Sequence, residues 1–362
     1  MIWRKDYIWS NEDLKNRLKR YYGLINGLYY AKYLIAKTIP AEISLDSPLD
    51  SLWAEHDRLS AIFQKEFDMF DNKNKRSLHF VSPSYLDLKI EIANRSLESC
   101  EFCEHRCKVN RFQTDHGVCR LNSKSRVSSA FLHPGEEDPL VPSGTIFFSS
   151  CMFKCVFCQN FDISTNPHSG HIVSPKELAK LANSLSKEGA LNINYVGGDP
   201  IPNTHTILTS LKYQTENITQ LWNSNLYCTE NTMKLLFDVI DLWLPDFKYG
   251  NNECGLKYSR IPRYYDVISR NLKMIAEHGD EIIIRHLVLP NHIHCCTFPI
   301  LEFIHDNLPN ALVNIMGQYR PEYLVRSQPS RFPEIARRPT RDEMHSAFEY
   351  ADQLGIVWRP VS

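Results

Sequence analysis

Three cysteines, Cys151, Cys155 and Cys158, lie in the segment SSCMFKCVFCQN with the spacing C-x₃-C-x₂-C. Structural zinc sites take four ligands, usually as two separated pairs, and iron–sulfur clusters usually take four thiolates. A four-iron cluster held by three thiolates keeps one iron open to an outside ligand. Phe157, just before the last cysteine, can shield such a cluster from water. Unless these are three unrelated buried thiols, the spacing predicts a metal centre with one open position.

A second group of cysteines precedes the first and has the spacing C-x₂-C-x₃-C-x₁₁-C. Its members are Cys100, Cys103, Cys107 and Cys119. Four thiolates can close either a tetrahedral zinc site or a [4Fe–4S] cluster without an open iron. His105 and His116 lie within the same stretch and could each replace a thiolate. The spacing predicts a bound metal or cluster here but leaves its identity open, with a slight preference for iron–sulfur.

The other cysteines carry weaker signals. The segment HIHCC contains His292, His294, Cys295 and Cys296. Adjacent cysteines chelate a single metal ion poorly, so a structural role is favoured there over a further metal site. Cys228 and Cys254 are isolated in the sequence, and we expect both to be buried free thiols.

The sequence pattern around these cysteines predicts an α/β fold. Short apolar runs of strand length alternate with helical stretches: TIFFSS, LNINYVGG, LWNSNLYC, LWLPDFKYG, EIIIRHLVLP and ALVNIMGQY. This alternation predicts βαβ units with a parallel sheet, as an open sheet or a partial barrel of about six units. Ligands of such folds bind at the carboxyl ends of the strands. The Cys151 segment, GGDP, SN and DFK each follow one of these runs, so we expect an active site there.

Three segments are predicted along the chain. Residues 1–95 contain helical patterns in YYGLINGLYYAKYLIAK and LDSLWAEHDRLSAIFQKEF, show no residues of obvious chemistry, and are expected to form a helical appendage or a partner-contact surface. Residues 96–140 form a Cys-rich metal- or cluster-binding segment. Residues 141–362 form the α/β part.

Composition narrows the classes of function. Lys plus Arg is 41 and Asp plus Glu is 42, so the net charge of -1 gives no reason to expect binding to nucleic acid or to an anionic membrane. No apolar run reaches the length of a membrane span, and the amino terminus lacks the apolar centre of a signal peptide. We therefore expect a cytoplasmic protein. In that reducing compartment, eleven cysteines favour metal or cluster binding over disulfides.

The triad, with an aromatic residue before its last cysteine, resembles the signature of the radical S-adenosylmethionine (SAM) enzymes. The resemblance extends through TIFFSSCMFKCVFCQNFDIS, NYVGGDPIP, LWNSNLYCTE, LWLPDFKYG, YSRIPRYY, IIIRHLVLPNH and NIMGQYRP to the PflX-type branch, which is similar to pyruvate formate-lyase activating enzyme. It covers roughly residues 95–360 and includes the Cys100–Cys119 group. It implies a partial (β/α)₆ radical SAM barrel, and it does not explain the first 95 residues.

The resemblance implies a definite chemistry. The amino and carboxylate groups of SAM would chelate the iron left open by Cys151, Cys155 and Cys158 in a [4Fe–4S] cluster. A low-potential electron donor of the flavodoxin or ferredoxin type would reduce the cluster, and cleavage of SAM would give methionine and a 5′-deoxyadenosyl radical. That radical would abstract hydrogen from a protein or small-molecule substrate inside a dry pocket. A glycine Cα–H of a glycyl-radical enzyme is one such target, by analogy.

Further residues are expected around SAM. Gly197 and Gly198 in GGDP would let the backbone approach a ligand closely. Asp199 corresponds to the Glu of the family's usual Gly-Gly-Glu element and would accept from the SAM amino group, with a reach shorter by one methylene. Asp246 and Lys248 resemble an Asp-x-Lys element that contacts SAM, and strand alternation would point both to one face. A half-exposed strand salt bridge is the alternative for this pair.

Three more residues are candidates for the SAM carboxylate or ribose: Asn225, Arg285 and His286. The planar guanidinium of Arg285 suits a carboxylate. For each of these residues, packing in the core is an equally good explanation. The competing hypothesis for the whole chain is a non-catalytic iron–sulfur electron-transfer or metal-binding protein, which would need only the cysteines and would leave the strand-end motifs without a purpose.

Overall fold

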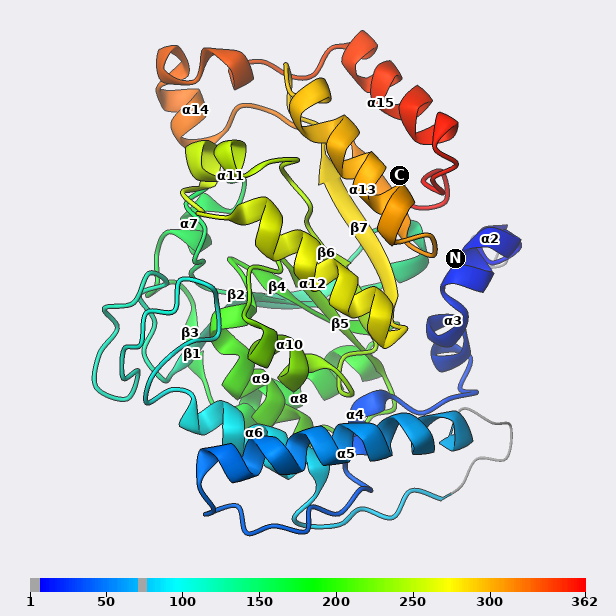
Figure 1. Ribbon diagram of the computed structural model, residues 1–362, viewed down its shortest axis with the longest axis vertical. Helices are drawn as coiled ribbons and strands as arrows, with labels where there is room; N and C mark the ends of the chain where they lie inside the picture. Colours follow the sequence, from blue (N-terminus) through cyan, green and yellow to red (C-terminus); the bar gives the residue numbers. More distant parts are fainter. Residues whose placement is uncertain (1–6, 71–76) are drawn as a thin grey trace.

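The computed structural model describes residues 7–70 and 77–362, and its centre is an eight-stranded sheet in the order β3-β1-β2-β4-β5-β6-β7-β8 (Figure 1). Six strands are parallel: β2 (Ser143–Phe148), β4 (Asn192–Gly197), β5 (Thr219–Ser224), β6 (Leu242–Pro245), β7 (Glu281–Leu287) and β8 (Leu312–Met316). At one edge, β1 (Ser125–His133) and β3 (His171–Val173) are antiparallel. The sheet does not close, so the predicted partial barrel of six βα units is confirmed.

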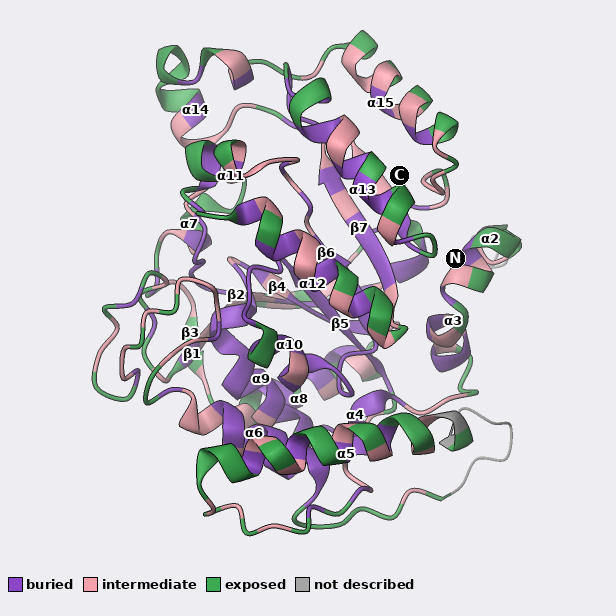
Figure 2. Ribbon diagram, in the orientation of Figure 1, coloured by how far each residue is buried: buried purple, intermediate pink, exposed green. Residues whose placement is uncertain are grey.

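Helices cover the outer face of the parallel strands. They are α8 (Pro175–Lys187), α9 (Thr204–Tyr213), α10 (Glu230–Leu236), α11 (Asn252–Ser259), α12 (Tyr264–His278) and α13 (Phe298–Asn307), followed by α14 (Tyr323–Ser327) and α15 (Arg341–Gln353). Helix α8 illustrates why they form. Ser174 and Glu177 make a reciprocal capping box and Pro175 occupies the first turn. Figure 2 shows buried and exposed stretches alternating along α12 and α13, as expected for helices that pack one face on the sheet.

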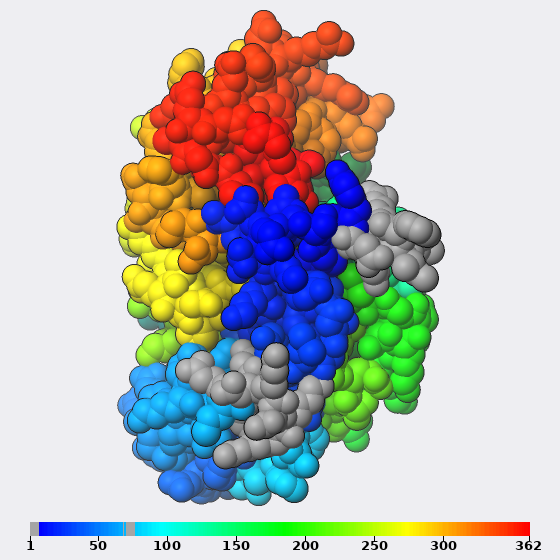
Figure 3. All heavy atoms as spheres, turned by 90° about the vertical axis from the view of Figure 1, so that its right-hand side faces the viewer, coloured from blue at the N-terminus to red at the C-terminus, as the bar shows by residue number. Residues whose placement is uncertain are grey.

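The amino-terminal extension is helical, as predicted. It contains α2 (Glu12–Arg17), α3 (Lys19–Ile25), α4 (Lys32–Ala36), α5 (Leu49–Phe70) and α6 (Tyr85–Arg95), whereas residues 1–6 and 71–76 lie outside the described residues. Leu14, Leu18 and Tyr21 pack in one apolar cluster with inward-facing strand residues such as Leu242 and Ile283. Figure 3 shows this segment lying against the body of the molecule. The extension therefore closes one end of the barrel interior.

The Cys-rich segment between the extension and the barrel has two parts. Residues 97–124 contain no helix or strand, whereas β1 pairs with β2 and belongs to the sheet. Within the described ranges 7–70 and 77–362, no helix has both the length and the apolar character needed to span a membrane.

Candidate active site

A cavity of about 690 Å³ lies at the carboxyl ends of the parallel strands, within the size range of small-molecule sites. The ends of all six parallel strands contribute to its lining. The three cysteines of the triad line it together with Gly197, Gly198, Asp199, Asn225, Asp246, Lys248 and Arg285. Strand-end motifs that are up to 134 residues apart in the sequence (Cys151 to Arg285) thus share one cavity, as the sequence predicted.

The two glycines of GGDP allow the end of β4 to pack closely against the loop that carries Cys151. Gly197 has φ of +121°, and a Cβ on Gly198 would lie 1.8 Å from the carbonyl oxygen of Ser150. The backbone N–H of Asp199 donates to that same carbonyl at 3.1 Å. Only glycine permits so close an approach. The close contact anticipated with a ligand is therefore, in the structure, a contact between the end of β4 and the cysteine loop.

Each cysteine of the triad has a polar neighbour. The amide Nδ2 of Asn225 lies 3.6 Å from the Sγ of Cys151. The hydroxyl of Ser259 lies 2.9 Å from the Sγ of Cys155. The hydroxyl of Ser164 lies 3.3 Å from the Sγ of Cys158. Hydrogen bonds to cluster sulfurs tune the reduction potential of iron–sulfur centres, so these three neighbours fit a cluster site.

The electrostatics of the triad fit the same interpretation. Burial, opposed by the charge of Lys248 and assisted by the Cys158 thiol, raises the pKa of Cys155 to about 12. Burial also raises the pKa of Cys151, and Asp199 and the other two thiols add to this. Such thiols become thiolates when a metal binds them. The donor set therefore suits an iron–sulfur cluster and leaves one iron for a ligand in the cavity.

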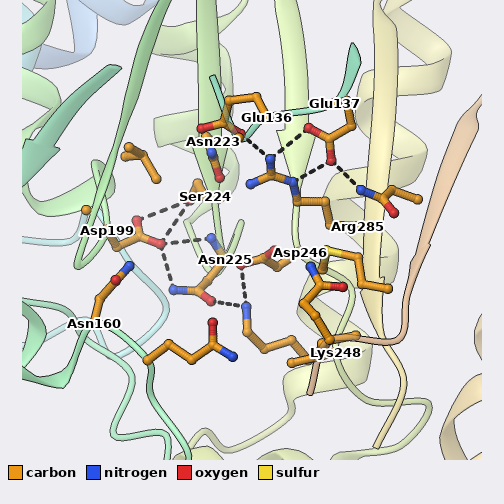
Figure 4. A pocket seen from close by; sticks show the side chains of 18 of the residues that line it. Glu136, Glu137, Asn160, Asp199, Asn223, Ser224, Asn225, Asp246, Lys248 and Arg285 are labelled. Atoms are coloured by element: carbon orange, nitrogen blue, oxygen red, sulfur yellow. Dashed lines mark hydrogen bonds and ion pairs between the residues drawn. The ribbon is translucent and has the colours of Figure 1, made fainter. Parts of the chain in front are cut away.

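Polar side chains from three strand ends form a chain beside the triad (Figure 4). The Nζ of Lys248 contacts a carboxylate oxygen of Asp246 and donates to the Oδ1 of Asn225 at 2.7 Å. The Nδ2 of Asn225 donates to the Oδ2 of Asp199 at 2.8 Å. Burial alone would lower the pKa of Lys248, but Asp246 and the cysteine thiols more than offset it and raise the pKa. Lys248 is thus a fixed cation beside the cysteines.

Asp199 is fully engaged by the protein. Its carboxylate accepts from the backbone N–H of Ile201 at 2.9 Å, from the backbone and side-chain amides of Asn225, each at 2.8 Å, and from the hydroxyl of Ser224. Burial raises its pKa to about 6 although these hydrogen bonds oppose the shift. In this arrangement, Asp199 fixes the position of Asn225. Its expected contact with the SAM amino group stays a prediction.

Arg285 and His286 differ although they are adjacent. The guanidinium of Arg285 lines the cavity and is ion-paired with Glu136 and Glu137, with Nε 2.7 Å from the Oε1 of Glu137. A SAM carboxylate would therefore have to compete with two glutamates for Arg285. His286 faces the other way on β7 and is fully buried, with its ring nitrogens 2.9 Å from Phe247 O and Thr297 Oγ1. It lies outside the cavity.

Phe157 is buried among aromatic rings next to the triad. Its ring packs edge-on against Tyr319, with centroids 5.5 Å apart, and against Tyr249 at 6.5 Å. It also lines the cavity, and its expected role in keeping water from the cysteines stays a prediction.

The second cysteine group lies beside the first. The thiols of Cys100, Cys107 and Cys119 are all near enough to Cys103 to add to the pKa increase that burial causes there. The hydroxyl of Ser150, the residue before Cys151, donates to the carbonyl of Cys119. Cys103 also forms a backbone bridge with Cys228, in the loop that follows β5. The four predicted ligands are therefore brought together, whereas the side chain of His116 points into solvent, 86% exposed.

One expectation about the cysteines is wrong. Cys254 is not isolated: its thiol lies with those of Cys295 and Cys296, all three within 4.8 Å of one another. Cys228 is a buried free thiol as expected, 3.3 Å from the sulfur of Met233.

Several polar residues of the cavity were not foreseen from the sequence. They are Glu136, Glu137, Asn160, Asn223 and Asn314. Glu136 and Glu137 come from the loop after β1, and Asn314 comes from β8, where its side chain donates to Glu137 at 2.7 Å. Strand-end position, which marked Ser224 through the SN motif, could also have indicated Asn223, but no local pattern marks the two glutamates.

Comparisons with known proteins agree with this geometry. The model of the radical SAM superfamily matches residues 145–304. A protein of Methanocaldococcus jannaschii, named Uncharacterized protein MJ0674, is 46% identical over 346 residues, which are 94% of this chain and 98% of that one. The family match includes the three cysteines of the triad and most of the residues that line the cavity, and the relative spans nearly the whole chain.

Solved structures show weaker likeness. A domain of pyruvate-formate lyase-activating enzyme from Bacteroides vulgatus is 15% identical, covers 46% of this chain and 96% of its own, and has a TM-score of 0.37. Streptococcus suis SuiB bound to precursor peptide SuiA is 14% identical, covers 83% and 62%, and has a TM-score of 0.43.

An open barrel of parallel strands, with three cysteines facing a cavity at its carboxyl end, defines the radical SAM class. The chain belongs to the radical SAM superfamily. Members of this superfamily are generally enzymes, and the domain implies a [4Fe–4S] cluster and SAM.

Proposed function

We propose that this protein cleaves SAM reductively at a [4Fe–4S] cluster held by Cys151, Cys155 and Cys158, and abstracts hydrogen from a substrate in the manner of an activating enzyme. The observation that carries the proposal is the row of Asp246, Lys248, Asn225 and Asp199 beside these cysteines in one cavity. A protein that only stored or transferred electrons would need no cavity of about 690 Å³ next to its cluster. The row also supplies the charged and polar groups that a zwitterionic ligand requires.

The side chains of this chain have separable parts in that activity. Lys248 offers a fixed positive charge to the thiolates and to the carboxylate of SAM. Asn225 bridges the two ends of the row, because it accepts from Lys248 and donates to Asp199. Phe157 excludes water from the cysteines, as radical chemistry requires. When bound, the cluster supplies the electron for cleavage of the sulfonium carbon–sulfur bond, and this cleavage gives the 5′-deoxyadenosyl radical.

The substrate and the electron donor are the finer part of the proposal. The resemblance to activating enzymes supports a glycine Cα–H of a partner protein as the hydrogen that is abstracted. The single-electron reduction calls for a flavodoxin or ferredoxin type of donor in the cytoplasm, where cysteines stay reduced.

For the Cys100–Cys119 group, we propose a second [4Fe–4S] cluster. Thiolates on one zinc ion with bonds of about 2.3 Å lie about 3.8 Å apart. In neither this group nor the triad do any three thiols lie within 4.8 Å of one another. Thiolates bound to different irons of a cluster are farther apart than thiolates on one ion, so the wider spacing supports a cluster. The carbonyl of Cys119 accepts from the hydroxyl of Ser150, so this group lies close to the triad.

The test is anaerobic reconstitution with iron and sulfide, followed by dithionite and SAM, with 5′-deoxyadenosine and methionine measured by mass spectrometry. Wild-type protein is expected to form both, with about eight irons per chain. Cys155→Ala removes one ligand of the catalytic cluster and should abolish SAM cleavage. Cys103→Ala should lower the iron count and keep at least part of the cleavage.

Two outcomes would overturn the proposal. Wild-type protein with a full cluster that forms no 5′-deoxyadenosine is not an enzyme of this class. Equal loss in Cys155→Ala and Cys103→Ala would mean that the division into a catalytic and an auxiliary site is wrong.

A further inference from the structure

Three cysteines that belong to neither cluster group meet behind the active site. Cys254 lies in α11, and Cys295 and Cys296 lie in a π-helical turn, Ile293–Thr297, which leads into α13. Their thiols are all within 4.8 Å of one another, and no other three metal-ligating side chains in the described ranges are this close. None of the three lines the cavity of the active site. We propose that they form a separate site for one thiophilic metal ion of the zinc type.

The geometry suits a single ion. Thiolates on one tetrahedral zinc ion lie about 3.8 Å apart, and the Sγ atoms of Cys295 and Cys296 are 3.9 Å apart. Adjacent cysteines ordinarily chelate badly, but the π-helical turn changes how successive side chains project. π-Helical turns are rare and occur frequently at functional sites. Soft thiolate ligands select zinc or monovalent copper over hard cations such as magnesium.

The fold holds the two halves of this site together independently of any metal. Asn251 caps α11, since its Oδ1 accepts from the backbone N–H of Cys254 at 2.8 Å. Its Nδ2 donates to the carbonyl of Cys295 at 2.7 Å. A Cβ on Gly250 would lie 2.7 Å from the carbonyl oxygen of Cys296, so a glycine is needed for the two segments to pack. One short segment therefore aligns all three thiols.

The surroundings are compatible with metal binding. Cys296 is buried, Cys254 is half-buried and Cys295 is exposed, so an ion can enter from solvent and then be enclosed on one side. His292 contacts Cys254 but is not one of the three clustered ligands. Its ring is held elsewhere, with Nδ1 2.7 Å from Pro290 O and Nε2 3.0 Å from the hydroxyl of Tyr258. The proposed site therefore uses three thiolates, with solvent in the fourth position.

A disulfide is the main alternative use of these thiols. It would join only two of them and leave the third without a partner, whereas a metal ion uses all three. All three are free in the structure, and the expected cytoplasmic compartment is reducing. Metal binding therefore accounts for more of the arrangement than oxidation does.

A metal there would steady the active site from behind. Helix α11 ends at Ser259, whose hydroxyl is 2.9 Å from the Sγ of Cys155. The carbonyls of Tyr258 and Ser259 accept from the backbone N–H groups of Val156 at 2.8 Å and Lys154 at 3.0 Å. Tying the start of α11 to the π-helical turn would thus fix the helix that supports the cysteine loop.

The experiment measures zinc and iron per chain in full-length protein purified anaerobically from cells supplied with both metals. We expect about one zinc in the wild type. Cys295→Ser, at an exposed position that folding tolerates, and Cys254→Ser should each lose the zinc and keep the iron. Cys228→Ser is the matched control, because it makes the same change at a thiol outside all three groups, and it should keep both metals.

Chelator competition gives the size of the effect. Removal of one thiolate should weaken zinc binding by at least about 100-fold, the upper limit for loss of a residue that merely supports a ligand. Added Co²⁺ should give thiolate charge-transfer absorption in wild type and in Cys103→Ala, and none in Cys295→Ser. The Cys103→Ala variant separates this site from the Cys100–Cys119 group.

Three results would overturn the proposal: zinc retained in both Cys254→Ser and Cys295→Ser, zinc lost from Cys103→Ala instead, or a disulfide among the three cysteines in anaerobic protein. The last result would identify a redox pair. The proposal is independent of SAM cleavage, because zinc content is measured without the reaction, and either one can fail while the other stands.

Discussion

Networks of charged and polar side chains lie at both ends of the barrel, but one network borders a cavity and the other is buried. At the carboxyl ends of the strands, Asp246, Lys248 and Asn225 surround an open cavity. At the amino ends, Asp241 and Asp280 are buried under the helical extension and ion-paired with Arg20 and Lys32. In barrel enzymes, the catalytic residues lie at the carboxyl ends of the strands, whereas residues at the amino ends contribute to stability. The charged side chains at the closed end are therefore assigned to holding the extension in place, and those at the open end to the reaction.

Breaking the closed end should have the largest effect, on stability. Lys32 and Asp280 form an ion pair in which the side chains are 3% and 4% exposed. Lys32→Met leaves a buried carboxylate without its main cation, which should lower the free energy of unfolding by about 3 kcal/mol. Urea denaturation followed by circular dichroism measures this change.

Two controls sharpen this test. Arg58→Met breaks a pair with Glu55 on a surface where Arg58 is 42% exposed, and its effect should be much smaller. SAM cleavage per folded molecule should be unchanged in Lys32→Met. A large loss of that activity would mean that the closed end takes part in the reaction.

Breaking the open end should act on the reaction instead. Lys248→Met removes the cation that Asp246 and Asn225 hold beside Cys155. Misplacement of SAM should slow cleavage by about 100-fold, or about 2.7 kcal/mol of activation free energy. The rate of 5′-deoxyadenosine formation at saturating dithionite measures it, with iron content checked first. Lys212→Met, at a half-exposed lysine on α9, should keep the wild-type rate; a wild-type rate in Lys248→Met would remove Lys248 from the site.

The difference between the two ends also marks what sequence can predict. The six strands and the motifs at their carboxyl ends are local patterns, and the position of a strand end predicts which side chains meet. The triad, Asp199, Asn225, Asp246 and Lys248 were placed in one cavity on that basis. His286 shows the limit, because its neighbour Arg285 takes the cavity face of β7 and leaves it in the core.

Contacts between distant segments could not be predicted in the same way. Arg285 meets Glu137 across 148 residues and Lys32 meets Asp280 across 248. Cys254 joins Cys295 and Cys296 only because Gly250 and Asn251 pack α11 on the π-helical turn. Neither periodicity nor spacing encodes such a pairing, since each half is locally an ordinary polar or free-thiol residue. Because the extension acts through such contacts, its helical pattern alone did not predict that it closes one end of the barrel.

The closed end should also respond to pH. Burial lowers the pKa of His278, but Asp280 and Asp238 more than offset this and raise it to about 8. Because this value exceeds the ordinary 6.5, the stabilisation is fully present below pH 6.5 and is lost as pH rises through about 8. It amounts to about 2 kcal/mol.

The variant His278→Gln isolates this contribution from other titrating groups. Its deficit in unfolding free energy relative to wild type should be largest near pH 6 and should shrink by pH 9. A deficit that does not change with pH would mean that His278 is neutral in the folded protein. SAM cleavage is measured alongside, and its pH profile should not follow the stability difference if the two ends act separately.

The smallest effect should come from a substitution at the open end that changes the reduction potential of the cluster but keeps all of its ligands. Ser259→Ala removes the hydroxyl that lies 2.9 Å from the Sγ of Cys155 and keeps every cluster ligand. Losing one hydrogen bond of about 1 kcal/mol to a thiolate should lower the reduction potential of the cluster by roughly 40 mV. Redox titration followed by electron paramagnetic resonance measures the shift. Ser269→Ala, whose hydroxyl bonds within its own helix, should leave the potential unchanged, and an equal shift in both variants would show that the hydroxyl of Ser259 does not reach the cluster.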